Sequence, residues 1–361
     1  MSEKLKVILA AGGTGGHIFP AESLAAELLK KDHVVMLLSD KRYRKYSHSP
    51  AQMEVKKIPS ASLSGGIITK IKAVFSILLG FIAARKILKE EKADVVVGFG
   101  GYPSFPTVLA AISLGVKTVI HEQNSVLGRV NKLLAPRVGA IATSFEKVSG
   151  VAKDDKSKVV FTGNPVRPEI SALKDLPYPA LKKGDALHIL VIGGSQGASV
   201  FSEVVPHAIL SLPKEILEHV RIDQQCRQED LLAVREIYEK AGVNAELATF
   251  FDDMPARLAS AHLVVARSGA STISELTLAG KPSILVPYKH AMDDHQTANA
   301  VSLEKAGASI VVAQDDFNPD FLKNAIEEFV ENPDKLSDMA VRARESGKEN
   351  AVKDLAKLVV G

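Results

Sequence analysis

Two glycine-rich runs combine residue types that suit the binding of a phosphate group. GGTGGHIFPA occupies positions 12–21 and GGSQGAS positions 193–199, each after a short apolar run and before a helical pattern. Glycine lets backbone N–H groups approach an anion closely, and the helix that follows adds the positive end of its dipole. The first run also places His17 at the end of a strand, where it could act as a base. A tight turn with a surface histidine fits that run as well.

Polar residues and glycines follow two further apolar runs. HEQN, at positions 121–124, comes directly after KTVI, which suggests a hydrogen-bonding site or else a solvated turn. Gly98–Pro106 follows DVVV, and its three glycines and two prolines predict a rigid loop, shaped by its turn residues or by a ligand. Parallel α/β sheets bind ligands at the carboxyl ends of their strands. Both segments are therefore candidate ligand contacts.

Two segments in the second half of the chain carry more polar groups. In ARSGASTISEL, at 266–276, Ser268, Ser271 and Thr272 could bind an anion, and Glu275 could accept from sugar hydroxyls. Thr272 and Glu275 also have the spacing of a capping box, a structural role. PYKHAMDDHQTANA, at 287–300, gathers histidines and aspartates. We expect no metal site there, because its histidines are five apart and the chain has no DxD element.

Alternating strand and helix patterns must position these residues. Several of the strand-like runs are apolar throughout, as in parallel strands buried on both faces. Residues 5–21 and 187–203 also resemble each other, each as a strand, a Gly-Gly loop and a helix. The fold class predicted is therefore α/β, with two doubly wound domains in tandem. The predicted strands are Lys6–Ala10, Val34–Leu38, Asp94–Val97, Lys117–Ile120, His188–Ile192, Arg221–Gln224, His262–Ala266, Ser283–Val286 and Ser309–Val312.

Composition narrows the class of protein. The 361 residues are 46% hydrophobic and 24% charged, which suits two globular domains and excludes disordered, collagen-like and coiled-coil chains. A formal charge of +3 without a dense basic cluster indicates no nucleic-acid partner. One cysteine and no signal-peptide pattern lead us to expect a cytoplasmic protein. The longest mostly apolar run, 73–84, is about half the roughly 20 residues that span a bilayer.

The stretch KIKAVFSILLGFIAARK, at 70–86, has more large apolar residues than one helix stripe needs. Its periodicity slightly favours a buried core helix. Exposure of its apolar residues beside its basic ones would instead suit an anionic membrane surface. The candidate membrane residues are Lys70, Ile71, Lys72, Phe75 and Leu79.

Taken together, GGTGGHIFPA, GGYPSFP, HEQN, TGNPVR, GGSQGA and RSGASTISEL through DDHQTANA resemble the motifs of the MurG family of bacterial cell-wall glycosyltransferases, in the family's order. The resemblance implies the GT-B fold, with two Rossmann-like domains facing across a cleft. The first would span 1–163 and bind the acceptor and membrane, and the second, 164–340, would bind UDP-GlcNAc. The segment from about 341 to 361 could pack anywhere, including back on the first domain.

The resemblance also implies an activity. Members move N-acetylglucosamine from UDP-GlcNAc to the 4-hydroxyl of the muramoyl sugar of lipid I, with inversion, and so make lipid II for peptidoglycan. The resemblance further implies catalysis without a metal or other cofactor. It also implies a peripheral position on the cytoplasmic face of the plasma (inner) membrane, and a role in cell-wall synthesis, cell shape and division. Cell-wall and division proteins are candidate partners.

Single residues match the family's functional positions. His17 matches the histidine assigned as catalytic base, with Glu122 as the next candidate, and Thr14, Gly15 and Gly16 match the loop assigned to the acceptor's diphosphate. Phe251 stands where members often have an aliphatic residue whose main chain reads uracil, and His295 where some have a second glutamine. The other residues expected to bind substrate, chiefly UDP-GlcNAc, are Asn124, Arg167, Ser195, Arg267, Ala270, Ser271, Thr272, Glu275 and Gln296.

Two alternative functions remain open from the sequence. An NAD(P)-dependent oxidoreductase would use the first glycine run with Asp40, but that run has no third glycine in the register of the dinucleotide fingerprint. It also has no P-loop lysine. A non-catalytic nucleotide-sugar-binding protein would use the same loops without turnover.

Overall fold

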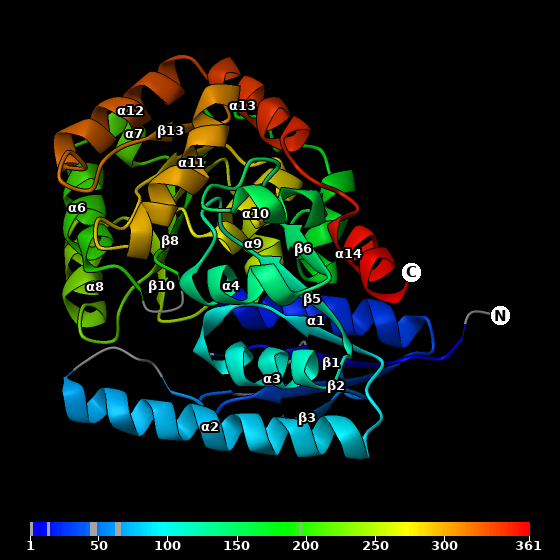
Figure 1. Cartoon of the computed structure of the whole chain (residues 1–361). Coiled ribbons are helices and arrows are strands. Elements are labelled where there is room, and N and C mark those ends of the chain that lie inside the picture. The colour runs from blue at the N-terminus through cyan, green and yellow to red at the C-terminus, as the bar shows by residue number, and fades with distance from the viewer. Residues whose placement is uncertain (1–2, 13–14, 44–48, 62–65, 183, 195–196) are drawn as a thin grey trace. The chain divides into compact units, whose positions relative to one another are not determined.

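The computed structural model describes residues 3–12, 15–43, 49–61, 66–182, 184–194 and 197–361. The chain divides into two compact units (Figure 1). The first comprises Met1–Arg167 together with Asn350–Gly361, and the second comprises Pro168–Glu349. The division falls after Arg167, and the segment that returns to the first unit begins at Asn350, whereas the sequence led us to expect 163 and about 341.

The first unit is a seven-stranded parallel sheet covered by helices on both faces. Its strand order is β3-β2-β1-β4-β5-β6-β7. The strands are β1 (Lys6–Ala10), β2 (Val34–Ser39), β3 (Glu54–Lys57), β4 (Val95–Gly98), β5 (Lys117–Glu122), β6 (Ala140–Thr143) and β7 (Val159–Phe161). The helices are α1 (Gly15–Lys30), α2 (Ile67–Glu90), α3 (Gly101–Ser113), α4 (Arg129–Leu134) and α14 (Ala351–Val360), with 3-10 turns η1 (Ala135–Arg137) and η2 (Lys153–Lys158).

The second unit is a six-stranded parallel sheet in the order β10-β9-β8-β11-β12-β13. Its strands are β8 (Leu187–Ile192), β9 (Val220–Gln225), β10 (Asn244–Ala248), β11 (Leu263–Ala266), β12 (Ser283–Leu285) and β13 (Ser309–Val311). Its helices are α5 (Pro168–Ser171), α6 (Ser199–Leu210), α7 (Lys214–Leu217), α8 (Leu231–Lys240), α9 (Met254–Ser260), α10 (Ala270–Ala279), α11 (His295–Ala306), α12 (Pro319–Glu331) and α13 (Asp334–Glu345), with η3 (Ala172–Asp175) and η4 (Met292–Asp294).

The two sheets repeat one topology. In each, the first strand lies inside the sheet, the next two strands extend to one side, and the fourth pairs on the other side. The order therefore reverses between β1 and β4 in the first unit and between β8 and β11 in the second. Such a reversal leaves a crevice at the carboxyl ends of the two strands, which is where doubly wound folds bind ligands. The predicted α/β class and the internal duplication are confirmed.

Alternate residues of β1 supply the cores on the two faces of the first sheet. Val7 and Leu9 pack in a cluster with side chains of α1 and α14. Ile8 and Ala10 pack in a second cluster with side chains of α2, α3 and α4. All four side chains are fully buried, as expected of a strand in the middle of a parallel sheet. The C-terminal helix α14 thus completes the core of the first unit.

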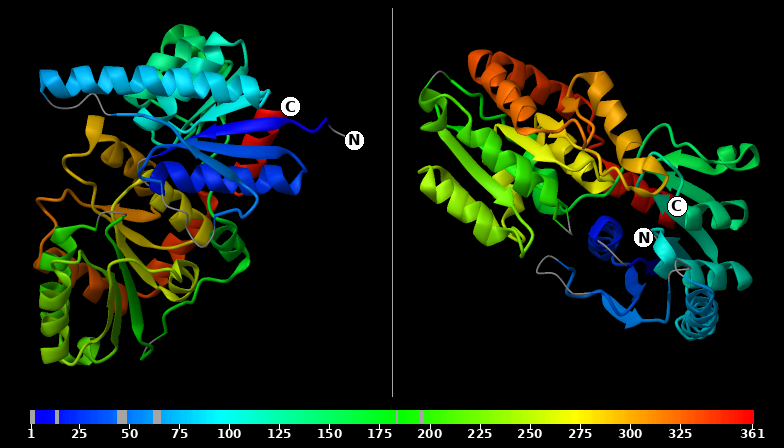
Figure 2. Two further views of the ribbon diagram at one scale, coloured as in Figure 1. Left: turned by 90° about the horizontal axis from the view of Figure 1, so that it is seen from below. Right: turned by 90° about the vertical axis from the view of Figure 1, so that its left-hand side faces the viewer.

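Helix α2 has the reverse of the usual pattern, with its small residues inside and its large apolar residues outside. Figures 1 and 2 show it, in light blue, running along one side of the first unit beside α3. Its buried residues include Ala73, Gly80 and Ala84. The predicted alternative of a buried core helix is therefore wrong. The exposed large side chains form one stripe that includes Ile67, Ile68, Ile71, Val74, Phe75, Leu78, Leu79 and Ile82.

The length of α2 also corrects an expectation. It has 24 residues, and an 18-residue window of it has a mean hydropathy of 2.0, so by length and composition it could cross a membrane. The apolar run 73–84, on which the expectation was based, covers only part of this helix. Buried core helices and signal sequences share this length and composition, so these two properties do not make α2 a membrane span. Only 17% of this window is buried in the protein.

Two segments predicted as loops begin helices instead. Helix α1 begins at Gly15, inside the first glycine run, so His17 lies in its first turn. Helix α3 begins at Gly101, so most of the predicted rigid loop Gly98–Pro106 is helical. Pro103 lies in the first turn of α3, where a backbone N–H has no helical partner to lose.

Gly80 sets how closely α2 packs. A Cβ atom built on Gly80 would overlap the carbonyl oxygen of Pro59 and lie 3.3 Å from Cβ of Pro106. We expect Gly80→Ala to lower the free energy of unfolding. Overpacking destabilises a protein by about 1–3 kcal/mol, which exceeds the stabilisation of about 1 kcal/mol from the higher helix propensity of alanine. Urea unfolding followed by circular dichroism measures this.

Ser76→Ala, on the same helix, is the control, since it adds no atom. It should change stability by no more than about 0.5 kcal/mol. If the two variants unfold at the same urea concentration, Gly80 does not limit the packing of α2.

Candidate functional site

The crevice between β1 and β4 brings three separate segments of the first unit together. Gly12 lies two residues beyond the end of β1, and a Cβ atom built on it would lie 2.8 Å from Cβ of Pro103 and 3.2 Å from Oγ of Ser39. The end of β2, the end of β1 and the start of α3 therefore meet at one edge of the sheet. Glycine is required at position 12 by this close approach.

His17 meets the HEQN segment at this edge. Its Nδ1 lies 2.9 Å from Oε1 of Gln123, a residue 106 positions later in the chain. His17 is half-buried, whereas His121 and Gln123 are buried. The structure thus brings the predicted base and the predicted hydrogen-bonding segment into one cluster. Gly15 and Gly16 share the first turn of α1 with His17, and Thr14 lies outside the described residues.

Glu122 is occupied by four hydrogen bonds. Its Oε1 accepts from the backbone N–H and the side-chain amide of Asn124, at 3.0 and 3.2 Å. Its Oε2 accepts from the N–H of Gly128 and the amide of Asn131, both at 2.8 Å. Because every contact is a donor to the carboxylate, Glu122 serves to anchor the segment that carries Asn124. This geometry favours His17 over Glu122 as the base.

Arg167 lies at the end of the first unit's main segment. Its guanidinium carbon is 5.1 Å from the ring centroid of Phe19, on α1. The arginine that the sequence singles out is therefore held beside the helix that carries His17. The cation–π contact orients its side chain within this unit.

The crevice between β8 and β11 is built from the second glycine run and the start of α10. A Cβ atom on Gly193 would lie 2.6 Å from the backbone N of Ala198, so the loop closes tightly on itself. Gly194 and Gly197 have φ values of +79° and +68°, which favour glycine. The described residues of this run confirm a strand–glycine loop–helix unit. Ser195 lies outside the described residues.

Helix α10 begins at Ala270 with Gly269 as its N-cap and no side-chain cap. Thr272 is therefore the third residue of the helix, and the predicted capping box of Thr272 and Glu275 is wrong. The first-turn N–H groups, including those of Ser271 and Thr272, have no partner within the helix and carry partial positive charge. Within the described part of the chain, the buried hydroxyls of Ser268 and Ser271 also have no hydrogen-bond partner.

Gln225, at the end of β9, joins two loops at this edge, and the sequence analysis missed it. Its Oε1 accepts from the N–H of Gly193 at 3.1 Å. Its amide donates to the carbonyl oxygens of Gly194 and Thr249, each at 3.0 Å. The glycine loop and the segment that leads to Phe251 are therefore clamped by one buried side chain. A polar residue closing a predicted buried strand was the signal that could have revealed it.

Two of the residues predicted to bind UDP-GlcNAc, Arg267 and Gln296, make hydrogen bonds to backbone groups around this crevice. Arg267 is buried and donates to the carbonyl oxygens of Val286 and Pro287, at 2.9 and 3.2 Å. Gln296 accepts from the backbone N–H of Tyr288 at 3.0 Å. Both hold the segment after β12 in place, a positioning role that the sequence did not indicate.

Phe251 is buried, and its ring lies 4.0 Å from the guanidinium carbon of Arg257. That guanidinium is in turn paired with the carboxylates of Asp223, Glu246 and Asp253. The loop that contains Phe251 is therefore fixed by a stacked and paired arginine, which the sequence analysis did not foresee.

The polar segment 287–300 does not converge on a metal-binding arrangement. Among the described residues, no group of three or more histidine, cysteine, aspartate and glutamate side chains could hold a metal ion. His295 Nδ1 lies 2.7 Å from the carbonyl oxygen of Met292, and Asp294 accepts from the hydroxyl of Thr297. These contacts organise the start of α11.

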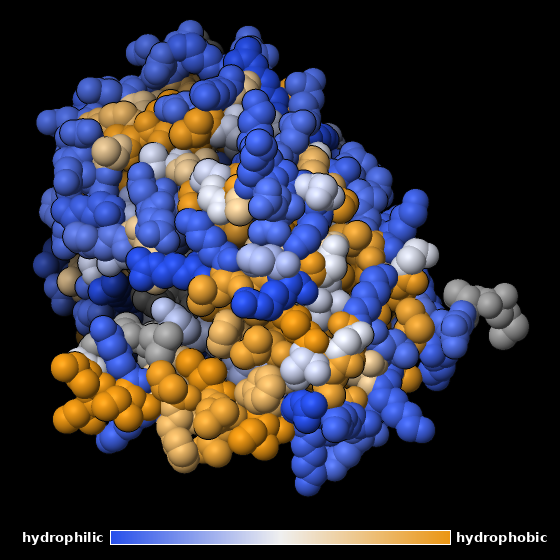
Figure 3. Space-filling model, viewed as in Figure 1, coloured by the Kyte–Doolittle hydropathy of each residue, from blue (hydrophilic) through white to orange (hydrophobic). Residues whose placement is uncertain are grey.

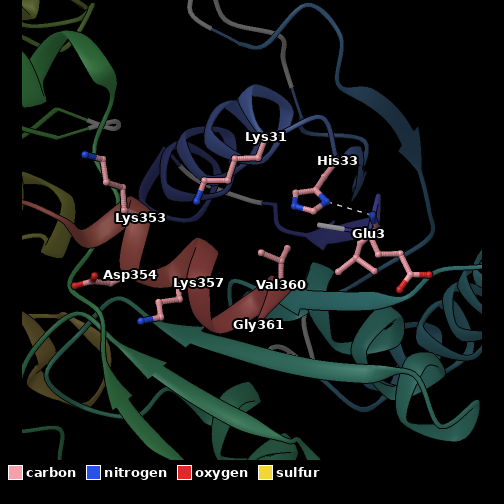
Figure 4. Close-up of a pocket in the computed structure, with 9 residues that line it drawn as sticks. Glu3, Lys31, His33, Lys353, Asp354, Lys357, Val360 and Gly361 are labelled. Carbon is pink, nitrogen blue, oxygen red and sulfur yellow. Dashed lines mark hydrogen bonds between the residues drawn. The ribbon is translucent and has the colours of Figure 1, made fainter. Parts of the chain in front are cut away.

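A cavity of about 520 Å³ lies away from both crevices, near the chain termini in the first unit (Figure 4). Lys31, His33, Lys353 and Lys357 line it together with Glu3 and Asp354. It contains none of the predicted site residues, and both basic and acidic side chains line it. The two crevices, rather than this cavity, are the candidate site.

Gln225 offers a test of how the second crevice is built. Gln225→Leu removes three hydrogen bonds and leaves the N–H of Gly193 without its partner, so we expect a loss of about 2–3 kcal/mol of unfolding free energy. The amide of Gly193 should also exchange with solvent faster. Gln228→Leu is the matched control, since Gln228 is exposed three residues away. Equal unfolding midpoints for the two leucine variants would contradict the clamp.

Comparisons with known proteins identify the family of this chain. The glycosyltransferase family 28 N-terminal domain matches residues 7–143, and the family's C-terminal domain matches residues 188–359. A relative from Rhodospirillum centenum, named UDP-N-acetylglucosamine–N-acetylmuramyl-(pentapeptide) pyrophosphoryl-undecaprenol N-acetylglucosamine transferase, is 47% identical over 98% of this chain and 94% of its own length. A relative of the same name from Sphingopyxis alaskensis is 47% identical, with 98% and 90% covered.

A solved structure is similar over the same extent. The crystal structure of Acinetobacter baumannii MurG matches with a TM-score of 0.78 and 31% identity, covering 98% of this chain and 99% of that one. Both halves of the family pattern, the full-length relatives and the two-sheet fold therefore agree. The chain belongs to glycosyltransferase family 28, and to the MurG group within it.

Proposed function

We propose that this chain is an N-acetylglucosaminyltransferase that moves N-acetylglucosamine from UDP-GlcNAc to the 4-hydroxyl of the muramoyl sugar of lipid I. The product is lipid II, the precursor of peptidoglycan. The names of the full-length relatives support this reaction. The observation that carries it in the structure is the pair of crevices at like points of two duplicated sheets, one with a histidine beside it. One crevice suits a nucleotide diphosphate, and the other suits activation of an alcohol.

The reaction is a direct displacement at the anomeric carbon of the donor sugar. The proton of the acceptor hydroxyl passes to His17 as its oxygen forms the new bond to C1. The bond from C1 to the diphosphate breaks, and UDP leaves with the electron pair. Inversion needs no protein nucleophile. His17 then releases its proton to water, which completes the balance.

Stabilisation of the departing UDP is assigned to the second crevice. The N-terminus of α10 offers unpaired N–H groups, and the buried hydroxyl of Ser271 has no partner among the described residues. Hydrogen-bond donors at a helix N-terminus favour a developing negative charge. Glu275 is assigned to the ribose, the main chain at Phe251 to uracil, and Gln296 to the donor sugar. We expect the reaction to proceed without a metal ion.

Replacement of His17 tests the chemical assignment. His17→Ala should lower kcat for lipid II formation by about 10²–10⁴-fold while leaving UDP-GlcNAc affinity largely intact. The measurement is UDP release and lipid II formation from UDP-GlcNAc and lipid I, with donor affinity from calorimetry. Glu275→Ala should instead weaken donor affinity.

Near-normal turnover by the His17→Ala protein would exclude His17 as the base. If the unsubstituted protein binds UDP-GlcNAc but forms no lipid II, the chain is a nucleotide-sugar-binding protein. Binding of a nicotinamide dinucleotide in place of UDP-GlcNAc would favour an oxidoreductase.

The exposed stripe of α2 supports a peripheral position on the cytoplasmic face of the plasma membrane. Ile71, Phe75 and Leu79 are 65%, 62% and 43% exposed, and Lys70 and Lys72 are exposed beside them. Figure 3 shows apolar side chains gathered over this helix. The transfer of large apolar side chains out of water is favourable, and lysines are attracted to anionic lipid headgroups. Lipid I is a membrane lipid, so this position would give access to it.

Vesicle binding tests this surface. Phe75→Ser should weaken sedimentation with phosphatidylglycerol-containing vesicles by about tenfold or more, since burying such a side chain contributes about 1.5–3 kcal/mol. Leu232→Ser is the matched control, because Leu232 is 71% exposed on α8 of the second unit. Equal vesicle binding by both variants would contradict attachment through α2.

A further inference from the structure

We infer that Gln123 and His121 hold His17 in the tautomer that carries its proton on Nδ1, so that Nε2 is the atom that accepts the proton of the acceptor hydroxyl. The role of this tautomer rests on the proposed function, but the tautomer itself does not. Gln123 acts through His17 and is therefore a positioning residue.

Three hydrogen bonds run in series from the backbone to His17. Nε2 of His121 lies 3.1 Å from the carbonyl oxygen of Gly163. Nδ1 of His121 lies 2.9 Å from Nε2 of Gln123. Oε1 of Gln123 lies 2.9 Å from Nδ1 of His17. The direction of each bond follows from the one before it.

The series begins at a group with only one possible role. A carbonyl oxygen can only accept, so Nε2 of His121 must carry a hydrogen. His121 is fully buried, and its ring centroid lies 5.5 Å from that of Phe99. Burial lowers the pKa of His121 to about 4 and outweighs the hydrogen bond to Gly163, which acts the other way. The ring is therefore neutral near pH 7, and its Nδ1 must be an acceptor.

The amide of Gln123 can then point in only one direction. Its nitrogen faces two acceptors, Nδ1 of His121 at 2.9 Å and the backbone oxygen of His121 at 3.1 Å. Both amide hydrogens are used, which settles the positions of the amide nitrogen and oxygen. The oxygen consequently faces His17. Since an amide oxygen can only accept, Nδ1 of His17 must donate.

In a neutral imidazole with its hydrogen on Nδ1, the lone pair lies on Nε2. That edge of the ring runs along Gly100 and Gly101. A Cβ atom on Gly101 would lie 3.4 Å from Nε2 of His17, and one on Gly100 would lie 3.6 Å from Cε1. Both glycines have positive φ values, +78° and +70°. The backbone of Gly100 and Gly101 thus leaves room for the imidazole ring of His17. The basic nitrogen, Nε2, lies on the side of the ring away from Gln123.

The charged groups nearby leave this assignment unchanged. His121 faces His17 from β5, and the nearby charge of His17 lowers the pKa of His121 further, which keeps the His121 ring neutral. The carboxylate of Glu122, also on β5, is directed to Asn124, Gly128 and Asn131. Arg167 lies over Phe19 on the helix that carries His17. The neutral acceptor Gln123 is the group in contact with Nδ1 of His17.

The first experiment uses the unsubstituted full-length protein. Two-bond ¹H–¹⁵N correlation spectra of histidine-labelled protein at about pH 8.5 distinguish a protonated from an unprotonated ring nitrogen. We expect His17, identified by its loss in His17→Ala, to show a protonated Nδ1 and an unprotonated Nε2. His121 should show the opposite pattern. A proton on Nε2 of His17 would overturn the inference.

Substitution of Gln123 gives a second readout. Gln123→Met should release the tautomer in the spectrum and lower kcat about 10–100-fold, with the KM for UDP-GlcNAc changed by no more than about twofold. Gln123→Glu keeps an acceptor beside Nδ1, so it should retain the tautomer. Its carboxylate should stabilise the imidazolium and move the acidic limb of the kcat–pH profile up by about one unit.

Thr107→Val is the control, since it replaces a buried residue of the same unit with one of equal shape. The Thr107 hydroxyl has no hydrogen-bond partner in the described structure, so its loss should leave the spectrum and kcat unchanged. A Gln123→Met protein that keeps the tautomer and kcat would refute the positioning role. So would one that loses kcat while keeping the tautomer.

The proposed function can fail separately. If the unsubstituted protein forms no lipid II, the transferase assignment fails, and the spectrum still decides the tautomer. If lipid II is formed but the spectrum shows the other tautomer, the transferase assignment stands and the inferred role of Gln123 and His121 fails.

Discussion

The reversal of strand order beside β1 and β8 is the constraint on which the rest of the structure depends. The chain leaves β1 in one direction and later returns to pair β4 on its other side, and β8 and β11 repeat the arrangement. Right-handed crossovers then place helices on opposite faces and leave the carboxyl ends open between the two strands. Because both faces of β1 are buried, it cannot shift without exposing the core. The glycine loops follow from this, since their backbones meet neighbours too closely for a side chain at Gly12 or Gly193.

Both crevices are stabilised by the same kind of residue, a buried glutamine at the carboxyl end of a strand. Gln123 uses its donor and acceptor ends between two histidines, and Gln225 uses them between two loops. A side-chain amide suits this position because it satisfies buried donors and acceptors together without carrying a charge. Glu122 complements Gln123, since its carboxylate gathers donors only. Loops built in this way hold polar groups in fixed orientations while keeping the backbone near a ligand.

Helix α2 shows a different use of side-chain size. Its inward face has Ala73, Gly80 and Ala84, which let it lie close to the first unit, and its outward face has most of its large apolar residues. A soluble core helix would have the reverse distribution. The first unit thus combines a polar edge that carries His17 with an apolar outer stripe on α2.

The amino-acid pattern by itself determined the fold class, the duplication and most central strands, because strands buried on both faces are continuously apolar. It missed β3, β6, β7 and β10, which are short or contain polar residues, three of them at sheet edges where burial imposes less pattern. The motif residues His17 and HEQN were also visible in the sequence. Only the tertiary structure decided that Gln123 faces His17, that Glu122 anchors a loop, that Arg267 donates to backbone carbonyls and that α2 is exposed. These features depend on which distant segments meet, and packing of the whole sheet sets those contacts.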